Sequence, residues 1–326
     1  MRILRNLGHE VKTSGHSGYQ IIRLLSFFLA QIGGRLNGIS LILIDVFSTR
    51  AFYFAVFCSF FSRLLRIKYG LILHGGNLPA RFKTSRRLSR YILNNAVFVS
   101  SPSNYLANSA KTHFDIEVIV IPNPIQVTLN SLNLERLNRI FWVRSLNSIY
   151  NPEMAVEVLK EINSAGLDFE LIFIGPGDPN RINAVRELAS NYGLSDKVIL
   201  KGRMEREEWQ DFSRNGKYFI NTTNVDNTPS SVIEAMALGL IPISTNVGGI
   251  PYILEDGADG MLVEANDSRA MAETIVTLEK DEKLIMKLRR NGAEKFKETY
   301  SMKKIENAWK SLIKSIPQKQ KVYNEL

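Results

Sequence analysis

Short apolar runs alternate with longer segments of helical spacing along most of the chain. The runs are rich in Val, Ile, Leu and aromatic residues, which is typical of parallel strands buried on both faces. The predicted strands are residues 39–44, 68–73, 96–100, 118–121, 139–143, 170–174, 197–200, 218–222 and 241–245. The predicted helices are residues 19–32, 51–65, 103–112, 152–164, 207–215, 229–238, 268–279, 282–296 and 301–316, with another from the GPGDP segment to about residue 192. This alternation predicts an α/β fold.

The chain has room for two α/β domains of ordinary size, because it is 326 residues long. The Pro-Asn-Pro segment at 122–124 stops a predicted strand, so we expect a first domain at 1–125 and a linker at 126–138. A second domain is expected at 139–300, followed by a last helix and tail at 301–326. At the start of the chain, Gly8 is expected to close a short helix and residues 10–12 to begin a strand.

Cysteine and hydrophobic content exclude several classes of protein. Cys58 is the only cysteine, which excludes a disulfide framework and predicts a reducing, cytoplasmic compartment. Cys58 lies in the apolar run AFYFAVFCSFF, so a buried structural thiol is favoured over a nucleophile. No run reaches the roughly 20 apolar residues that span a bilayer, and the first residues lack the hydrophobic centre of a secretory signal. Peripheral membrane contact remains open.

The excess of positive over negative charge is confined to the first part of the chain. Residues 1–130 contain 15 Lys and Arg against 4 Asp and Glu, a net charge of +11, and the remainder carries 26 against 28, a net of −2. This asymmetry predicts attraction to an anionic membrane surface or a polyanionic acceptor, with a merely solvated basic face as the alternative. A nucleic-acid partner is not predicted, because no nucleic-acid module is recognisable. Candidate acceptor or membrane contacts are Arg81, Lys83, Arg86 and Arg87.

The stretch from Asn221 to Pro251 has the features of an anion site. Thr228 is expected to cap a helix, with Pro229 in its first position and Gly239 just past its last turn. The free amides at the start of that helix, together with nearby hydroxyls, are suitable donors to phosphate oxygens. Glu234 shares a helical face with the serines at 230 and 231, and ribose hydroxyls would satisfy its carboxylate. The alternative is a core-lining helix whose Glu234 pairs with a structural cation.

Several motifs occur in order across this stretch. Asp226 is followed after seven residues by Glu234, then by Ala-Met-Ala-Leu-Gly and the predicted strand 241–245. The loop NVGGIP at 246–251 and the segment EDGADGML at 255–262 follow. Together they resemble the acid-x7-Glu region of retaining glycosyltransferase family 4, within the group 1 glycosyltransferases. The resemblance implies a GT-B fold, in which two doubly wound Rossmann-like domains face a cleft and the last helix crosses back to the first domain.

The resemblance also implies roles for particular residues. Glu234 would hold the ribose of a nucleotide-sugar, Asp226 would meet a sugar hydroxyl, and His74 would orient the sugar from the first domain. Arg144 would bind the donor diphosphate through its two-pronged guanidinium. The remaining donor-binding residues would be Arg203, Met204, Asn227, Thr228, Pro229, Ser230 and Ser231.

Three features depart from the family pattern. The first strand and its Gly-rich loop are missing, so the chain is either N-terminally incomplete or has a shortened first domain. The family lysine that follows the diphosphate arginine is replaced by Ile149 and Tyr150, which weakens diphosphate binding or shifts it to other donors. Asp226 is one methylene shorter than the family's usual glutamate.

The predicted function is transfer of a sugar, with retention, from a nucleotide-sugar to a glycan or lipid-linked acceptor in cell-surface polysaccharide synthesis. We expect no cofactor and no metal, because no acid-x-acid metal motif is evident. The expected location is the cytoplasm or the inner face of the plasma membrane. Two alternatives remain: a GT-B enzyme that hydrolyses or epimerises a sugar nucleotide, and a non-catalytic subunit that binds sugar nucleotides or acts as a scaffold.

Overall fold

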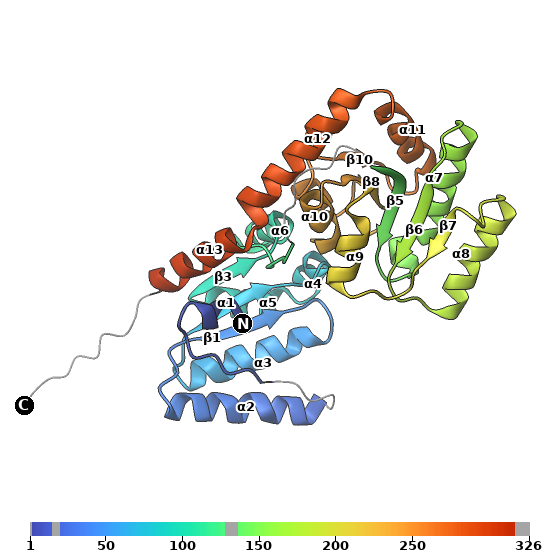
Figure 1. Cartoon of the computed structure of the whole chain (residues 1–326). Coiled ribbons are helices and arrows are strands. Elements are labelled where there is room, and N and C mark those ends of the chain that lie inside the picture. The colour runs from blue at the N-terminus through green and yellow to red at the C-terminus, as the bar shows by residue number, and fades with distance from the viewer. Residues whose placement is uncertain (1, 15–19, 128–135, 317–326) are drawn as a thin grey trace, which may run out of the picture. The chain divides into compact units, whose positions relative to one another are not determined.

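The computed structural model describes residues 2–14, 20–127 and 136–316. The chain divides into two compact units. The N-terminal unit comprises Met1–Pro122 with Lys303–Leu326, and the C-terminal unit comprises Asn123–Met302. Each unit has one parallel sheet with helices packed on it (Figure 1). The last helix therefore belongs to the N-terminal unit, although it follows the C-terminal unit in sequence.

The N-terminal unit contains a four-stranded sheet in the order β1-β2-β3-β4. Its strands are β1 (Ile42–Val46), β2 (Tyr69–Leu73), β3 (Phe98–Ser101) and β4 (Ile119–Val120). Its helices are α1 (Arg2–Asn6), α2 (Gln20–Leu36), α3 (Ala51–Leu64), α4 (Leu78–Thr84), α5 (Arg86–Asn94), α6 (Asn104–Phe114) and α13 (Met302–Ser315). One hydrophobic cluster joins the sheet to α3 and α6, and it includes Leu71, Phe52 and Leu106.

The C-terminal unit contains a six-stranded sheet in the order β10-β9-β8-β5-β6-β7. Its strands are β5 (Leu137–Val143), β6 (Glu170–Ile174), β7 (Val198–Leu200), β8 (Gly216–Asn221), β9 (Ile241–Thr245) and β10 (Met261–Val263). Its helices are α7 (Pro152–Ser164), α8 (Pro179–Asn191), α9 (Arg206–Ser213), α10 (Ser230–Ala237), α11 (Ser268–Leu278) and α12 (Glu282–Lys295). Short turns of helix lie at η1 (Ser148–Tyr150), η2 (Ile250–Tyr252) and η3 (Phe296–Tyr300).

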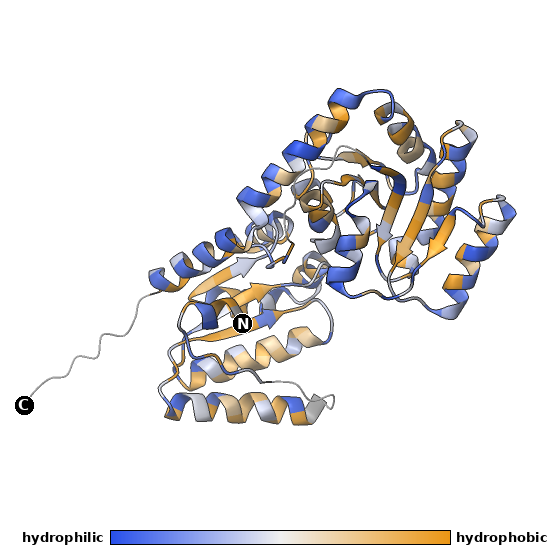
Figure 2. Cartoon of the chain, in the orientation of Figure 1, coloured by the Kyte–Doolittle hydropathy of each residue, from blue (hydrophilic) through white to orange (hydrophobic). Residues whose placement is uncertain are grey.

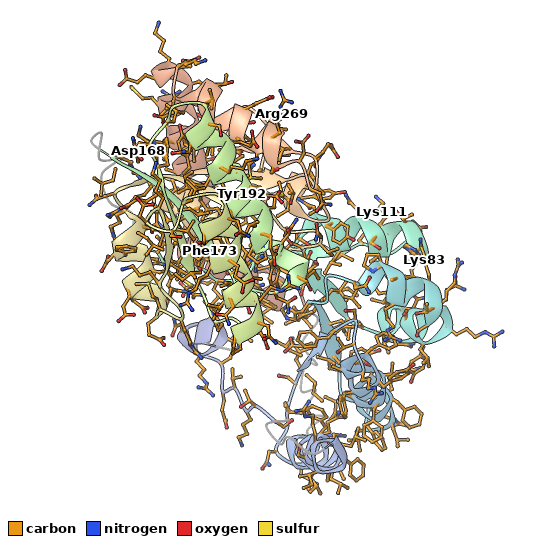
Figure 3. The ribbon with its side chains drawn as sticks, turned by 90° about the vertical axis from the view of Figure 1, so that its right-hand side faces the viewer. Lys83, Lys111, Asp168, Phe173, Tyr192 and Arg269 are labelled. Carbon is orange, nitrogen blue, oxygen red and sulfur yellow. The ribbon has the colours of Figure 1, made fainter. Side chains whose placement is uncertain are left out.

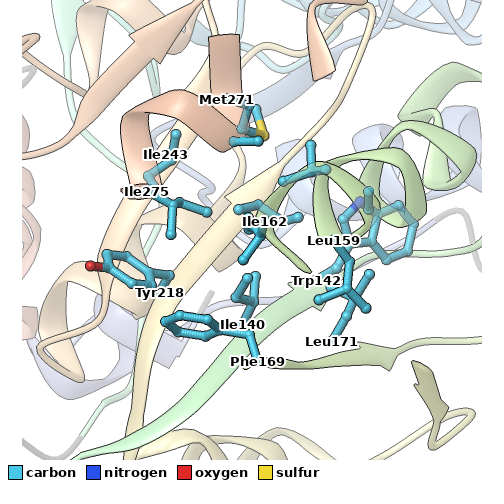
Figure 4. Close-up of a cluster of buried hydrophobic side chains, with 14 of the residues drawn as sticks. Ile140, Trp142, Leu159, Ile162, Phe169, Leu171, Tyr218, Ile243, Met271 and Ile275 are labelled. Atoms are coloured by element: carbon cyan, nitrogen blue, oxygen red, sulfur yellow. The ribbon is translucent and has the colours of Figure 1, made fainter. Parts of the chain in front are cut away.

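The sheet of the C-terminal unit is buried on both faces. Ile140 and Trp142 of β5 belong to a cluster with α7 and α11 (Figure 4), whereas Phe141 between them packs with residues of α10 on the other face. Strands therefore appear as apolar bands in the hydropathy view (Figure 2). Phe173 lies inside this unit, while Asp168 and Arg269 lie at its surface (Figure 3). The two-faced burial explains why the strand sequences are continuous apolar runs.

The strand order places a switch point between β5 and β8. β6 and β7 follow β5 on one side, and β8, β9 and β10 lie on the other. Loops after β5 and β8 leave the sheet at its carboxyl edge in opposite directions, which opens a crevice between them. The sequence from Arg144 and the sequence from Thr222 to Pro229 both start at this edge.

Most predicted elements are confirmed, and the differences have local causes. β1 starts at Ile42 instead of Ile39. The amide of Ile39 donates to the carbonyl of Gly34 at 2.8 Å, and Gly38 has a φ of +73°, so these residues cap α2 as a Schellman turn. Residues 10–12 form no strand, since no described strand pairs with them. Among the described residues no helix has the length and apolar content needed to cross a membrane.

Candidate functional site

A pocket of about 450 Å³ lies at the switch point of the C-terminal unit. It is bounded by the carboxyl ends of β5 and β6, the start of α9 and the first turn of α10. Its lining residues are Val143, Arg144, Ser145, Tyr150, Ile174, Gly175, Pro176, Arg203, Met204, Arg206, Trp209, Ser230, Ser231 and Glu234. The sequence predicted six of these as donor-binding residues, namely Arg144, Arg203, Met204, Ser230, Ser231 and Glu234.

Arg144 follows β5 directly and is held on two sides. Its Nη2 donates to Oδ2 of Asp226 in an ion pair. The guanidinium also lies over the ring of Tyr150, with 4.8 Å between the guanidinium carbon and the ring centroid. Its Nε is buried without a hydrogen-bond partner in the described structure. The cation is therefore fixed in direction, and it keeps one buried donor that no described group of the chain accepts from.

Asp226 contacts Arg144 but does not itself line the pocket. Its Oδ1 accepts from the amide of Asn227 at 2.8 Å. Burial raises the pKa of Asp226 above its ordinary value, and the Arg144 cation and the Asn227 amide act in the opposite direction. In this structure the carboxylate serves chiefly to orient Arg144.

The loop that carries Asp226 is supported by two glycines. The amide of Gly249 donates to the main-chain oxygen of Asp226 at 3.0 Å. A Cβ on Gly249 would lie 1.8 Å from the main-chain oxygen of Asn227, and Gly248 has a φ of +56°. These glycines therefore permit close packing of two protein segments, which is a different task from close approach to a ligand.

Glu234 is nearly fully buried in the wall of the pocket, with 2% of its surface exposed. Its Oε2 accepts from Nε2 of Gln210 at 3.2 Å, and its Oε1 lies 3.4 Å from Nε of Arg206. Burial raises the pKa of Glu234, while Arg206 and Gln210 lower it. Arg206 is thus the cationic partner that the alternative interpretation, a core-lining helix, requires for Glu234. The carboxylate nevertheless borders the pocket, where a ligand could reach it.

The start of α10 differs from the prediction. The helix begins at Ser230, and Pro229 occupies the N-cap position with an extended ψ of 111°. The prediction that Thr228 caps the helix is wrong, because Pro229 has not entered the helix and no side chain caps it. The hydroxyls of Thr228 and Ser231 are instead buried without hydrogen-bond partners in the described structure. Ser231 lines the pocket, whereas Asn227, Thr228 and Pro229 do not.

The sequence did not predict any site residue on α9, although three side chains of this helix lie at the pocket. Arg206 and Trp209 line it from α9, one helical turn apart, and Gln210 reaches Glu234 from the same helix. These residues follow Arg203 and Met204 closely in sequence and lie at the start of a predicted helix. That position is the sequence signal that could have identified them as site residues. Gly175 was read only as part of a turn, but a Cβ there would lie 1.8 Å from the main-chain oxygen of Arg144. It allows the loops after β5 and β6 to touch.

His74 belongs to the N-terminal unit, where it follows β2. Its Nε2 lies 3.1 Å from Oδ1 of Asp45, and its ring stacks on Phe47 with 5.5 Å between centroids. A Cβ on Gly75 would lie 2.4 Å from the amide nitrogen of Ser48, so this glycine lets the loops after β1 and β2 approach each other. His74 is therefore positioned by an acidic and an aromatic neighbour that the sequence did not single out.

The four candidate cations at 81–87 do not form one group. Nε and Nη2 of Arg81 donate to the main-chain oxygen of Ser48 at 2.9 and 2.8 Å. Arg81 also lies over the rings of Phe52 and Tyr53, so it ties α4 to the start of α3. Lys83, Arg86 and Arg87 are exposed (Figure 3 labels Lys83).

Within residues 2–14, 20–127 and 136–316, no group of three or more His, Cys, Asp or Glu side chains is arranged to hold a metal ion. The polar groups that converge on the pocket are cationic side chains, hydroxyls and one buried carboxylate. This donor set is suited to an anionic ligand that also carries hydroxyl groups.

Residues 129–295 match the family model of the glycosyl transferases group 1, which is just over half of the chain. The chain belongs to this family. An uncharacterized glycosyltransferase of Methanocaldococcus jannaschii is 26% identical over 265 residues, covering 80% of this chain and 70% of the relative. A putative colanic acid biosynthesis glycosyltransferase of Escherichia coli is 25% identical over 204 residues, but this covers only 48% of that relative.

Solved structures give the fold. Anabaena HepE, solved in complex with UDP, aligns with a TM-score of 0.76 at 14% identity and covers 96% of this chain and 88% of HepE. The fold class is therefore GT-B, as the sequence predicted, and this glycosyltransferase builds it from the two parallel sheets. The pocket lies within the segment matched by the family model.

Proposed function

We propose that this glycosyltransferase is a family 4 enzyme that moves a sugar, with retention at the anomeric carbon, from a nucleoside diphosphate sugar to a glycan or lipid-linked acceptor. The observation that carries the proposal is the shared pocket of Arg144, Ser231 and Glu234 at the switch point. HepE has also been solved with UDP-glucose, which makes a nucleoside diphosphate sugar the natural donor to test. Family 4 membership and retention are supported by the Asp226-x7-Glu234 spacing.

The chemistry requires stabilisation of a departing diphosphate. The bond between the anomeric carbon and the diphosphate oxygen breaks, a bond to the acceptor oxygen forms, and the acceptor hydroxyl proton leaves with the diphosphate or solvent. Negative charge grows on the leaving oxygens, so a fixed cation and fixed donors stabilise that state more than the ground state. Arg144 supplies the cation, and the hydroxyl of Ser231 with the first amides of α10 supplies donors.

Glu234 is proposed to hold the ribose. A buried carboxylate accepts well from two neighbouring hydroxyls, which would add to the contact with Gln210. Arg203, Met204 and Trp209 would border the nucleobase. Asp226 would keep Arg144 in position and meet a sugar hydroxyl, and the family resemblance gives His74 the role of orienting the sugar. The proposal includes no metal, because Arg144, Arg203 and Arg206 all line the pocket and supply positive charge, so turnover should persist in chelator.

The test is saturation-transfer NMR of the chain against UDP-, GDP-, TDP- and ADP-sugars. We expect one nucleotide to be selected, and binding to be lost in Arg144→Ala and Glu234→Gln. Arg269→Ala and Glu273→Gln are matched controls, because these two residues form an exposed ion pair on α11. Failure to bind any sugar nucleotide, or equal binding by Arg144→Ala, would contradict the donor site.

A non-catalytic subunit that binds sugar nucleotides is a second candidate. Two side-chain contacts favour it: Arg144 and Glu234 are both paired with groups of the chain itself, namely Asp226 and Arg206. Donor binding without transfer or hydrolysis, combined with normal cellular function of Arg144→Ala, would support the scaffold. Turnover of the bound donor would exclude it.

The acceptor is proposed to be a precursor in cell-surface polysaccharide synthesis, and the transfer is proposed to take place at the inner face of the plasma membrane. The putative colanic acid enzyme among the relatives supports this context. The exposed cations Lys83, Arg86 and Arg87 are the candidate contacts to an anionic acceptor or lipid head group. Their joint replacement by Gln should raise KM for the acceptor while donor binding is retained.

A further inference from the structure

The outer side of α2 is apolar although it faces solvent. Ile22, Leu25, Leu29 and Leu36 are 52%, 55%, 64% and 82% exposed. Their spacing of three, four and seven residues places them on one side of the helix. The other side already packs against α3, where Phe28 meets Phe61 with 4.8 Å between ring centroids.

Exposed apolar side chains also occur on α3. Tyr53, Phe60 and Leu64 are 52%, 51% and 65% exposed and also recur on one side of their helix. Figure 1 shows α2 lying along α3 within the N-terminal unit, and Figure 2 colours both helices orange and white over most of their length. These seven side chains are called the α2–α3 face below. Seven exposed apolar side chains on two adjacent helices indicate a binding surface, whereas single exposed apolar residues do not.

The charges around the α2–α3 face have one sign. Neither helix contains an acidic residue, and they carry Arg23, Arg35 and Arg63. From residue 11 to residue 114 the sequence has 13 Lys and Arg and a single acidic residue, Asp45. Arg23 lies over the ring of Phe54 and Arg63 over the ring of Tyr91. Arg35 is therefore the arginine of α2 that we assign to lipid phosphates, while the apolar side chains enter the edge of the hydrocarbon region.

A second copy of the chain is a poorer occupant. Two-fold pairing through the α2–α3 face would bring the same arginines together without an acidic residue on either helix to neutralise them. An anionic bilayer matches both the apolar side chains and the cations. The charge pattern therefore favours an anionic bilayer over a second copy of the chain.

We propose that the α2–α3 face is the membrane-docking surface of this glycosyltransferase, with α2 lying in the plane of an anionic bilayer. The inference rests on the proposed function, because a lipid-linked acceptor requires the enzyme to work at a membrane. The membrane contact is thereby assigned to α2 and α3, which lie outside the basic stretch at 81–90. The donor pocket is in the other unit, so the two can be tested separately.

The test is flotation of the full chain with vesicles of neutral phosphatidylcholine, or of phosphatidylcholine with about 30 mol% phosphatidylglycerol. We expect binding to the anionic vesicles, and a loss of at least about tenfold in the partition coefficient for Leu25→Gln/Leu29→Gln. Arg35→Gln should weaken binding about fivefold at low salt. Met286→Gln is the matched control, because Met286 is 49% exposed on α12 of the other unit.

Failure of the wild type to float, or equal flotation of the double variant, would overturn the docking surface. A dimer in light scattering that the double variant lacks, without flotation, would assign the face to a second copy instead. Circular dichroism confirms that the variants fold, and saturation-transfer NMR with the sugar nucleotides separates the two proposals. A chain that floats without binding a donor would refute the proposed function and leave the docking surface intact.

Discussion

Gln210 links the carboxylate of Glu234 to the start of the C-terminal unit. Its Nε2 donates to Oε2 of Glu234 at 3.2 Å and to the main-chain oxygen of Gln126 at 3.1 Å. Gln126 follows the Pro-Asn-Pro segment, and the neighbouring Ile125 packs in the same core as Val232 of α10. One buried amide thus orients the pocket carboxylate and fixes the segment by which the chain enters this unit.

Replacement of Gln210 by Leu is expected to destabilise the protein by about 1–3 kcal/mol, because a buried carboxylate oxygen and a main-chain oxygen lose their donor. Urea unfolding measures the change. Gln126→Leu is a matched control, since it removes an exposed amide but leaves the main-chain acceptor in place. Equal stability of Gln210→Leu and Gln126→Leu would show that the link does not contribute.

Glu234 should make stability depend on pH. Burial raises its folded pKa above the ordinary value of 4.5, so the unfolded chain gives up this proton first as the pH rises. The contribution of Glu234 to the free energy of unfolding is therefore fullest below pH 4.5 and is lost as the pH rises through the folded pKa.

The measurement is the Tm of wild type and Glu234→Gln from pH 4.5 upward. We expect the variant to gain stability relative to the wild type as the pH rises, because Gln does not ionise. Glu273→Gln, on the exposed side of α11, should run parallel to the wild type. Parallel curves for Glu234→Gln would mean that Arg206 and Gln210 fully compensate burial.

Tyr150 stands where the family resemblance places a lysine, and its ring supports Arg144. Tyr150→Phe should keep donor affinity within about twofold, because the ring face is retained. Tyr150→Ala should weaken the donor about fivefold, because Arg144 loses the ring that fixes its plane. Calorimetric titration with the selected sugar nucleotide measures both. Equal affinities for the Phe and Ala variants would refute the role of the ring.

The sequence predicted elements well where burial alone determines them. β6 and β9 have the predicted bounds, because each is an apolar run buried on both faces. Gly239 has the expected left-handed φ of +72° after α10. Ile39 was misassigned to a strand because an apolar residue after a helix can also complete a Schellman turn, and local pattern does not separate the two.

The pocket was predicted only in part, because its contacts join distant residues. Arg144 and Asp226 are 82 residues apart and meet because β5 and β8 are neighbours in the sheet. Local spacing carries no information about that pairing. Glu234 was recognisable from its motif, but its partners Arg206 and Gln210 depend on how α9 packs beside α10.

Gly249 provides a way to disturb the pocket without removing a charge. Its φ of −90° is accessible to any residue, so the effect of alanine would come from crowding alone. The added Cβ would lie 1.8 Å from the main-chain oxygen of Asn227, which must move and take the neighbouring Asp226 with it. We expect Gly249→Ala to cost about 1–3 kcal/mol of stability and to weaken the donor, because Arg144 loses its fixed partner.

Urea unfolding and donor titration test this expectation together. Gly33→Ala is the control, because a Cβ at Gly33 in α2 meets no atom within 4 Å and should stabilise the helix by about 0.5–1 kcal/mol. If Gly249→Ala loses stability but binds the donor as tightly as wild type, Arg144 does not depend on Asp226 for its orientation. If stability and donor affinity fall together, the Gly-Gly loop controls donor affinity through the backbone of Asp226.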